Sequence, residues 1–459
     1  MNADLFQKYV WDDLEGTRRA EILKRPDFYV MPNITENINE IIEDVKTRDD
    51  RSLINLTHQY DGVALHELEV TKSEFESCER LINSETKKAF EKFVDQTENF
   101  YLNHRPDSIE YDISTGIKYY RNFHPIEKVG FYIPGGPEPI ASTVIMLAVP
   151  ARIAGCSLRI MCSPPSNEKH VDPHILFAAK ISGVHQVFKI GGAQAMAAMA
   201  YGTQSVPKVD KILGRGGPWV TEASRIISQD LYGVSCEMPV SFSELLIIAD
   251  DKADSRLISV DLLAEAEQGI NTHSLLVTDS PRLAMEVEKI MIEDIKTLPR
   301  KLFARESLKN VTVVIARDLE QAVEISNLYA PAHLSIQVEK PRSLMKNIKN
   351  AGTVFLGELA SKSIGDYMGG ANHLLPTYGF SRVSNGISLN SFLKAVSFQE
   401  ISGEGVGNIG QLAELMSKLE GGDAHREAIR KRIEKARLST GQGCGFFVYK
   451  KGSPERKLI

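Results

Sequence analysis

Residues 129–136 read VGFYIPGG, a short apolar run that passes directly into a glycine turn. Two later stretches repeat this pattern, KIGGAQ at 189–194 and KILGRGG at 211–217. A segment with helical periodicity follows each of the three. Short buried runs that alternate with helices are typical of βαβ units, in which the strands are parallel. The sequence therefore predicts an α/β fold.

The predicted strands form two groups along the chain. The first group comprises residues 129–133, 158–162, 186–190 and 211–213, and the second comprises 245–249, 274–278, 311–316 and 353–356. Before them, Ile34, Ile38, Ile41, Ile42 and Val45 recur at helical spacing. We expect an N-terminal arm (1–24), a discontinuous first α/β domain (25–128 plus 239–387), a second α/β domain with the glycine turns (129–238), and a helical C-terminal tail (388–459).

The composition is that of an ordinary globular protein. Of 459 residues, 54 are Lys or Arg and 60 are Asp or Glu, which gives a net charge of −6. Such a chain has no global field that attracts a polyanion, so we expect no nucleic-acid partner. The five scattered cysteines form no disulfide framework or zinc knuckle. The most apolar run, residues 143–151, is too short to span a membrane, and the start lacks the apolar core of a secretion signal. We expect a cytoplasmic protein with no membrane partner.

The three glycine turns favour a ligand that carries phosphate. Glycine at the carboxyl end of a strand lets backbone N–H groups approach an anion, and the next helix adds its dipole. The G-x-G-x-x-G fingerprint is absent, and a single turn of this kind is usually only a tight connection. Three such turns in one predicted sheet converge on one crevice, which favours a nucleotide site.

Several motifs together resemble the histidinol dehydrogenase family. They are VGFYIPGG at 129–136, GGAQA at 191–195, VDKI at 209–212, YAPAHL at 329–334, GDY at 365–367 and NHLLPT at 372–377. The resemblance implies two intertwined α/β domains like incomplete Rossmann folds, small terminal helical segments, and a domain-swapped homodimer with a shared active site. It also implies that histidinol is oxidised through the aldehyde to the acid with two NAD, on a zinc ion that holds the substrate.

The resemblance assigns the NAD contacts to Tyr132, Gln194 and Gly217. The third departs from the family, which has an asparagine there in a Gly-Pro-Gly-Asn turn, whereas this chain reads GRGGP at 214–218. Arg215 in the same turn suits a phosphate, but a solvent-facing arginine explains it equally well.

The resemblance also implies a glutamate–histidine pair of bases, and here the pair is Ala332 and His333. In the family the histidine takes the alcohol proton and the glutamate activates the water that converts aldehyde to acid. We therefore expect His333 to be catalytic, and we expect the second half of the reaction to be weakened.

Four metal-ligand positions carry over by resemblance, and they are Glu265, Gln268, Asp366 and His425. Glu265 and Gln268 replace the family's glutamine and histidine, and three residues apart on a predicted helix they can face one site. Because oxygen donors replace an imidazole, the preference for zinc falls relative to manganese or magnesium. A bound zinc or manganese ion and a site without metal are both open.

The substrate contacts carried over by resemblance are Ser243, His333, His373 and Glu420. The segment before Ser243 differs, because the family's Pro-Ala-Gly-Pro-Ser-Glu is here PVSFSE at 239–244. Phe242 adds bulk there, and the changes cluster in the pocket.

Three functions follow from these observations. The preferred one is an NAD-dependent enzyme that oxidises a small polar amino alcohol and does not complete the aldehyde-to-acid step. The first alternative is an authentic histidinol dehydrogenase of histidine biosynthesis. The second is a non-catalytic dimer with a binding or regulatory role.

Overall fold

The computed structural model describes residues 6–26, 33–136, 139–237, 243–269, 271–296, 306–370 and 372–440. The chain divides into two compact units, one formed by Met1–Arg105 with Pro125–Leu393 and one formed by Pro106–His124 with Lys394–Ile459. The first unit contains two parallel sheets covered by helices, which confirms the predicted α/β fold.

One of these sheets carries the glycine turns. It has the order β6-β5-β4-β7-β8, and all its described pairs are parallel. Its strands are β4 (Lys128–Tyr132), β5 (Leu158–Ser163), β6 (Gln186–Lys189), β7 (Lys211–Gly214) and β8 (Ser235–Glu237). The strand order reverses between β4 and β7, so a crevice opens there at the carboxyl ends.

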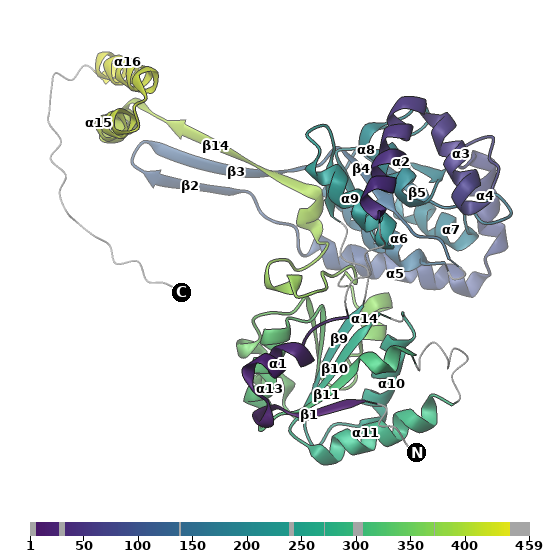
Figure 1. Cartoon of the computed structure of the whole chain (residues 1–459). Coiled ribbons are helices and arrows are strands. Elements are labelled where there is room, and N and C mark those ends of the chain that lie inside the picture. Colours follow the sequence, from purple (N-terminus) through teal and green to yellow (C-terminus); the bar gives the residue numbers. More distant parts are fainter. Residues whose placement is uncertain are drawn as a thin grey trace. The chain divides into compact units, whose positions relative to one another are not determined.

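Helices cover both faces of this five-stranded sheet, as Figure 1 shows. Those that connect its strands are α6 (Ala141–Ala154), α7 (Pro173–Ser182), α8 (Gly192–Tyr201) and α9 (Pro218–Gln229). Four preceding helices join them, α2 (Ile34–Arg48), α3 (Asp50–Asp61), α4 (Lys72–Leu81) and α5 (Ser84–Leu102).

The packing of α2–α5 differs from the expected domain division. The sequence grouped residues 25–128 with 239–387, but these helices share their cores with the five-stranded sheet. Ile38 of α2 lies in one cluster with Ile160 and Phe188, and Phe93 of α5 lies in another with Phe131. The apolar periodicity of 34–45 correctly marked a buried face, but it does not specify which sheet covers that face.

The second sheet of this unit has the order β1-β11-β10-β9-β12-β13 and is also parallel. Its strands are β1 (Gln7–Val10), β9 (Glu244–Ala249), β10 (His273–Thr278), β11 (Val311–Ile315), β12 (His333–Gln337) and β13 (Thr353–Leu356). Its helices are α1 (Gly16–Ile22), α10 (Ser255–Ala266), α11 (Pro281–Asp294), α13 (Leu319–Tyr329) and α14 (Lys362–Met368). The N-terminal arm therefore supplies an edge strand, β1, which Figure 1 shows beside β11.

The second unit is small. It contains β2 (Ile109–Ser114), β3 (Ile117–Pro125) and β14 (Leu393–Ile401) in the order β14-β3-β2, followed by α15 (Gly403–Leu419) and α16 (Asp423–Thr440), which pack on each other. In the described part of the expected C-terminal tail, a 3-10 helix (Leu389–Phe392) and strand β14 precede the α-helices. Short 3-10 helices lie at Trp11–Asp13, Leu308–Asn310, Pro341–Ser343, Met345–Asn347, Phe380–Arg382 and Leu389–Phe392. Within the described ranges, no helix is both long and apolar enough for a membrane span.

Candidate active site

A cluster of buried charges lies at the amino edge of the six-stranded sheet. Lys362 begins α14, and its Nζ lies 2.8 Å from Asp366 Oδ2 one helical turn later. The same Nζ lies 3.2 Å from Oε2 of Glu265, near the end of α10. The Lys362, Glu265 and Asp366 side chains are 7%, 1% and 16% exposed. One ammonium group therefore bridges two carboxylates in a place largely closed to water.

The charges in this cluster support one another. Burial alone would lower the pKa of Lys362, but Glu265 and Asp366 raise it above its ordinary value. For Asp366, burial acts to raise the pKa, and the Lys362 charge is the main cause of its net lowering. Burial lowers the pKa of Arg215, and the charges of the two carboxylates act in the opposite direction. The cluster thus holds two anions and two cations.

His333, the first residue of β12, faces this cluster. Its Nδ1 lies 3.0 Å from the Glu244 carbonyl oxygen, an acceptor, so Nδ1 carries the proton and Nε2 has a free lone pair. Nε2 is buried, has no hydrogen-bond partner among the described residues, and lies 3.9 Å from Asp366 Oδ1. Burial, with the Lys362 charge, lowers the pKa of His333 to about 4. The imidazole is neutral at pH 7 and can accept a proton.

His373 is also hydrogen-bonded to Asp366. Its Nδ1 donates to the Asp366 carbonyl oxygen at 3.1 Å, and its Nε2 accepts from the Thr143 hydroxyl of α6 at 3.3 Å. Burial lowers the pKa of His373, so this ring is also neutral. The two histidines expected at the substrate therefore both lie next to Asp366.

A buried ion pair holds the His333 segment in place. Arg25 donates from Nε and Nη2 to the two oxygens of Glu244, at 2.9 and 3.0 Å, and from Nη2 to the Tyr329 carbonyl at 2.8 Å. Its guanidinium stacks on the Tyr329 ring, 3.7 Å from the centroid. The turn that follows includes Ala330 at φ 57°, a strained conformation for a residue with a side chain. Arg25 and Glu244 thus fix the strained turn that presents His333.

Of the four expected metal ligands, Glu265 and Asp366 lie together on either side of the Lys362 ammonium group, Gln268 lies elsewhere, and His425 belongs to the second unit. Helix α10 ends at Ala266, so Gln268 lies in the following turn and is exposed, whereas the sequence placed it on the helix beside Glu265. Within the described ranges, no group of three or more His, Cys, Asp or Glu side chains could hold a metal. Zinc sites need at least three protein ligands, commonly nitrogen or sulfur. Within one chain, two carboxylates with an ammonium group between them do not fit the implied ion.

The expected cofactor residues lie at the carboxyl edge of the five-stranded sheet. The Tyr132 hydroxyl accepts from the Gly192 N–H at 3.0 Å, and burial raises the pKa of Tyr132 to about 12. Gly192 has φ 63°, and a Cβ there would lie 2.6 Å from Gln194 Oε1, so the turn requires glycine. Gly217 is the N-cap of α9, with φ −72° and open space where a Cβ would be.

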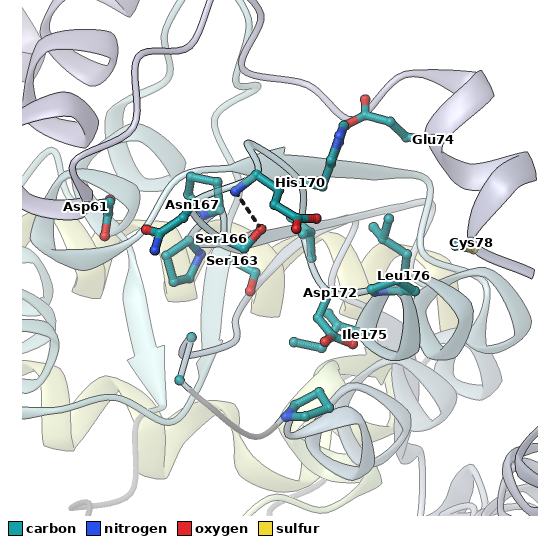
Figure 2. A pocket seen from close by; sticks show the side chains of 18 of the residues that line it. Asp61, Glu74, Cys78, Ser163, Ser166, Asn167, His170, Asp172, Ile175 and Leu176 are labelled. Carbon is teal, nitrogen blue, oxygen red and sulfur yellow. Dashed lines mark hydrogen bonds and ion pairs between the residues drawn. The ribbon is translucent and has the colours of Figure 1, made fainter. Parts of the chain in front are cut away.

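A cavity of about 950 Å³ opens at this edge (Figure 2). Its lining includes Tyr132 and the turn glycines Gly135, Gly136 and Gly192. Asp61, labelled in Figure 2, also lines it, and its Oδ2 is buried with no hydrogen-bond partner among the described residues. Backbone N–H groups and an unpaired carboxylate oxygen can together bind phosphates and a hydroxyl group.

The remaining predicted residues are Ser243, which precedes Glu244, and Glu420 and His425 of the second unit. Ser243 is buried just before β9, and its carbonyl accepts from the His273 N–H at 3.2 Å. Glu420 is the C-cap of α15 and His425 lies on α16, and both are exposed within the second unit.

The place of two residues in the cluster was not predicted from the sequence. Lys362 stands four residues before Asp366, the spacing of a helical ion pair, and this signal was available. Arg215 was considered as a phosphate contact or as a solvent-facing residue, and not as a partner of Glu265 and Asp366. Its electrostatic interaction with Glu265 and Asp366 arises from tertiary packing that no local pattern specifies.

Known proteins resemble this chain over nearly its whole length. The family profile described as Histidinol dehydrogenase matches residues 24–433. A histidinol dehydrogenase of Mannheimia succiniciproducens is 40% identical over 94% of this chain and 99% of its own length. One from Vibrio vulnificus is 41% identical over 93% and 98%. A crystal structure of histidinol dehydrogenase from Elizabethkingia anophelis superposes with a TM-score of 0.92 at 33% identity, covering 95% of this chain and 99% of that one.

Proposed function

Because the chain belongs to the histidinol dehydrogenase family, we propose that it is an authentic histidinol dehydrogenase, a cytoplasmic enzyme of amino-acid metabolism that oxidises histidinol with NAD. The sequence alone favoured oxidation of a small polar amino alcohol, other than or in addition to histidinol, without the aldehyde-to-acid step. The high coverage and the identities near 40% support the histidinol reading better.

The single observation that carries this proposal is the free Nε2 of His333. A base with a fixed tautomer, facing a carboxylate 3.9 Å away, suits removal of a proton from an alcohol. In the proposed step, the substrate O–H gives its proton to Nε2 while the hydrogen on carbon leaves as hydride. Asp366 then stabilises the imidazolium that forms.

NAD, when bound at the glycine turns, supplies the hydride acceptor. Tyr132, Gln194 and the Gly217 turn would hold it, and Asp61 Oδ2 offers an acceptor to one of its hydroxyl groups. The 950 Å³ cavity is large enough for part of a dinucleotide.

We also propose the homodimer with a shared site that the resemblance implies. On α15, Leu412, Leu415, Met416 and Leu419 are 57%, 54%, 55% and 72% exposed. Their spacing of i, i+3, i+4 and i+7 is that of one helix face. An exposed apolar stripe of this kind is typical of a protein–protein interface. A second copy of the chain would cover it and would also place Glu420 at the partner's substrate.

A second candidate activity is oxidation that stops at the aldehyde. Ala332 is the observation that favours this activity. The residue is fully buried, and its methyl group cannot activate water as a carboxylate does. Product analysis decides between the two: two NAD reduced per histidinol with histidine formed supports the full reaction, and one NAD with aldehyde trapped supports the second candidate. Absence of NAD reduction with histidinol and a panel of amino alcohols would contradict both and favour a non-catalytic role.

A further inference from the structure

Lys362 differs from an ordinary salt-bridge lysine in the identity of the two carboxylates that it contacts. Its Nζ lies 2.8 Å from Asp366 and 3.2 Å from Glu265, two of the positions at which the resemblance expects metal ligands. Lys362 is itself 6% exposed. Burying an ammonium group without a partner costs much free energy. The two carboxylates offset that cost for Lys362.

We propose that the Lys362 ammonium group takes the place of the divalent cation implied by the family, so that this enzyme binds and orients its substrate without a metal. The inference deepens the proposed function and rests on it for the identity of the substrate.

The charge balance of the cluster supports this substitution. Glu265 and Asp366 supply two negative charges, and Lys362 and Arg215 supply two positive charges that interact with both. A divalent ion between the same carboxylates would leave a buried excess of positive charge beside an ammonium group. Like charges at such short range repel strongly where water is excluded.

The geometry also leaves the ammonium group able to contact the substrate. An ammonium group has three N–H donors, and two acceptors are described for Nζ, Asp366 and Glu265. The third N–H can donate to the hydroxyl oxygen of the substrate while His333 Nε2 takes the proton. In an alcohol oxidation, a cation stabilises the negative charge that develops on that oxygen.

The first test uses the full-length wild-type protein. Elemental analysis after purification and calorimetric titration with Zn²⁺ and with Mn²⁺ should find far less than one ion per chain. The thermal midpoint should not change with added Zn²⁺ or with a chelator. One ion per chain, whose removal lowers the thermal midpoint, overturns the inference.

The second test changes the lysine. Lys362→Met keeps an unbranched stem and removes the charged terminal nitrogen, so the two carboxylates should now attract Zn²⁺ at least ~10-fold more tightly than in the wild type. Lys362→Arg keeps the charge and should exclude the ion as the wild type does. The matched control is Lys252→Met, which removes an exposed lysine 3.7 Å from Glu339 and should change nothing.

Unchanged Zn²⁺ affinity in folded Lys362→Met, or Zn²⁺ binding by Lys362→Arg as tight as by Lys362→Met, contradicts the inference. If the methionine variant does not fold, the wild-type ion content and the arginine variant still decide. Ion content is independent of turnover, so the two proposals fail separately. A metal-free protein that does not oxidise histidinol contradicts only the proposed function, and an active protein with a removable ion contradicts only this inference.

Discussion

His333 and His273 are both buried histidines, yet only His333 has a ring nitrogen left free toward a charged cluster. His273 Nδ1 is bonded to the Tyr329 hydroxyl at 2.9 Å, and burial lowers the pKa of His273 to about 3. We expect His333→Gln to lower kcat by about 10²–10⁴-fold with a small change in KM, because it removes a general base. His273→Gln, the matched control, should keep kcat near that of the wild type. Equal losses in the two folded variants would mean that His333 is only structural.

Gly217 is the position where the cofactor turn departs from the family. Its φ of −72° suits a residue with a side chain, a Cβ would meet nothing within 4 Å, and asparagine is a favoured N-cap. We expect Gly217→Asn to tighten NAD binding about five-fold, the effect of one hydrogen bond of ~1 kcal/mol. Gly217→Ala imposes the same backbone restriction without the amide, so it should leave the calorimetric Kd for NAD unchanged. Equal affinities in both variants would remove Gly217 from the NAD site.

The residues of the site were only partly predictable from the sequence. His333, His373 and Asp366 came from matched motifs, and the structure brings them together. Arg25 was not found, because its bonds to Glu244 and Tyr329 join segments more than 200 residues apart. Such contacts are decided by packing, and a single sequence shows no pattern for them.

At the scale of elements, apolar runs located most of the buried strands. Helical periodicity located the helix ends less accurately. Each of the eight predicted strand ranges overlaps an observed strand, since buried parallel strands read as continuous apolar runs. Six of the described strands were not predicted, and they are β1, β2, β3, β8, β12 and β14. Gln7–Val10 of β1 is mostly exposed, whereas β12 is fully buried but alternates polar with apolar residues. The end of α10 at Ala266 left Gln268 outside the helix, and helix ends are the least certain feature of a sequence pattern.

The start of α4 gives a stability prediction. Glu74 closes a capping box with Thr71 and also contacts His170 at 3.0 Å and Lys189 at 3.3 Å. Burial alone would raise the pKa of Glu74, but these partners lower it to about 2. The lowered pKa stabilises the fold above pH ~4.5, and this contribution is lost as the pH falls toward 2.

We therefore expect Glu74→Gln to lower the free energy of unfolding by about 2 kcal/mol at pH 7, allowing for solvent screening, and to flatten its fall between pH 4.5 and 2. Urea titrations at several pH values measure both effects. Glu76→Gln is the control, since Glu76 lies on the same helix, is 60% exposed and has a single ion pair at 3.8 Å. A Glu74→Gln curve parallel to that of the wild type would contradict the assignment.

At the scale of the whole molecule, the two sheets share one strand order. Counted along the chain, the five core strands of each sheet have the order 3-2-1-4-5, as β6-β5-β4-β7-β8 and β11-β10-β9-β12-β13. Strand β1 is added beside β11. The glycine turns lie at the carboxyl edge of one sheet, and His333 lies at the amino edge of the other. The sequence predicted two α/β halves, but it grouped residues 25–128 with 239–387, whereas α2–α5 pack on the five-stranded sheet. Amphipathic periodicity marks a buried face without specifying what covers it.

The assembly provides the last prediction. We expect light scattering at micromolar concentration to give twice the chain mass of 51.0 kDa. Leu415→Glu places a charge in the apolar stripe of α15 and should shift the mass toward the monomer. Leu231→Glu is its control, because Leu231 is 97% exposed outside that stripe. A wild-type mass of one chain would contradict the dimer.

The shared site can be tested by mixing two inactive variants. If Glu420 serves the partner's site, His333→Gln and Glu420→Gln damage different chains of the same site, and an exchanged heterodimer contains one intact site and one doubly altered site. Half of the molecules in an equal, randomly exchanged mixture are heterodimers, so activity should recover to about a quarter of the wild-type value. Neither variant alone should recover on the same treatment. A mixture that exchanges subunits and stays inactive would mean that each site is built from one chain, because only residues contributed by different subunits can complement each other.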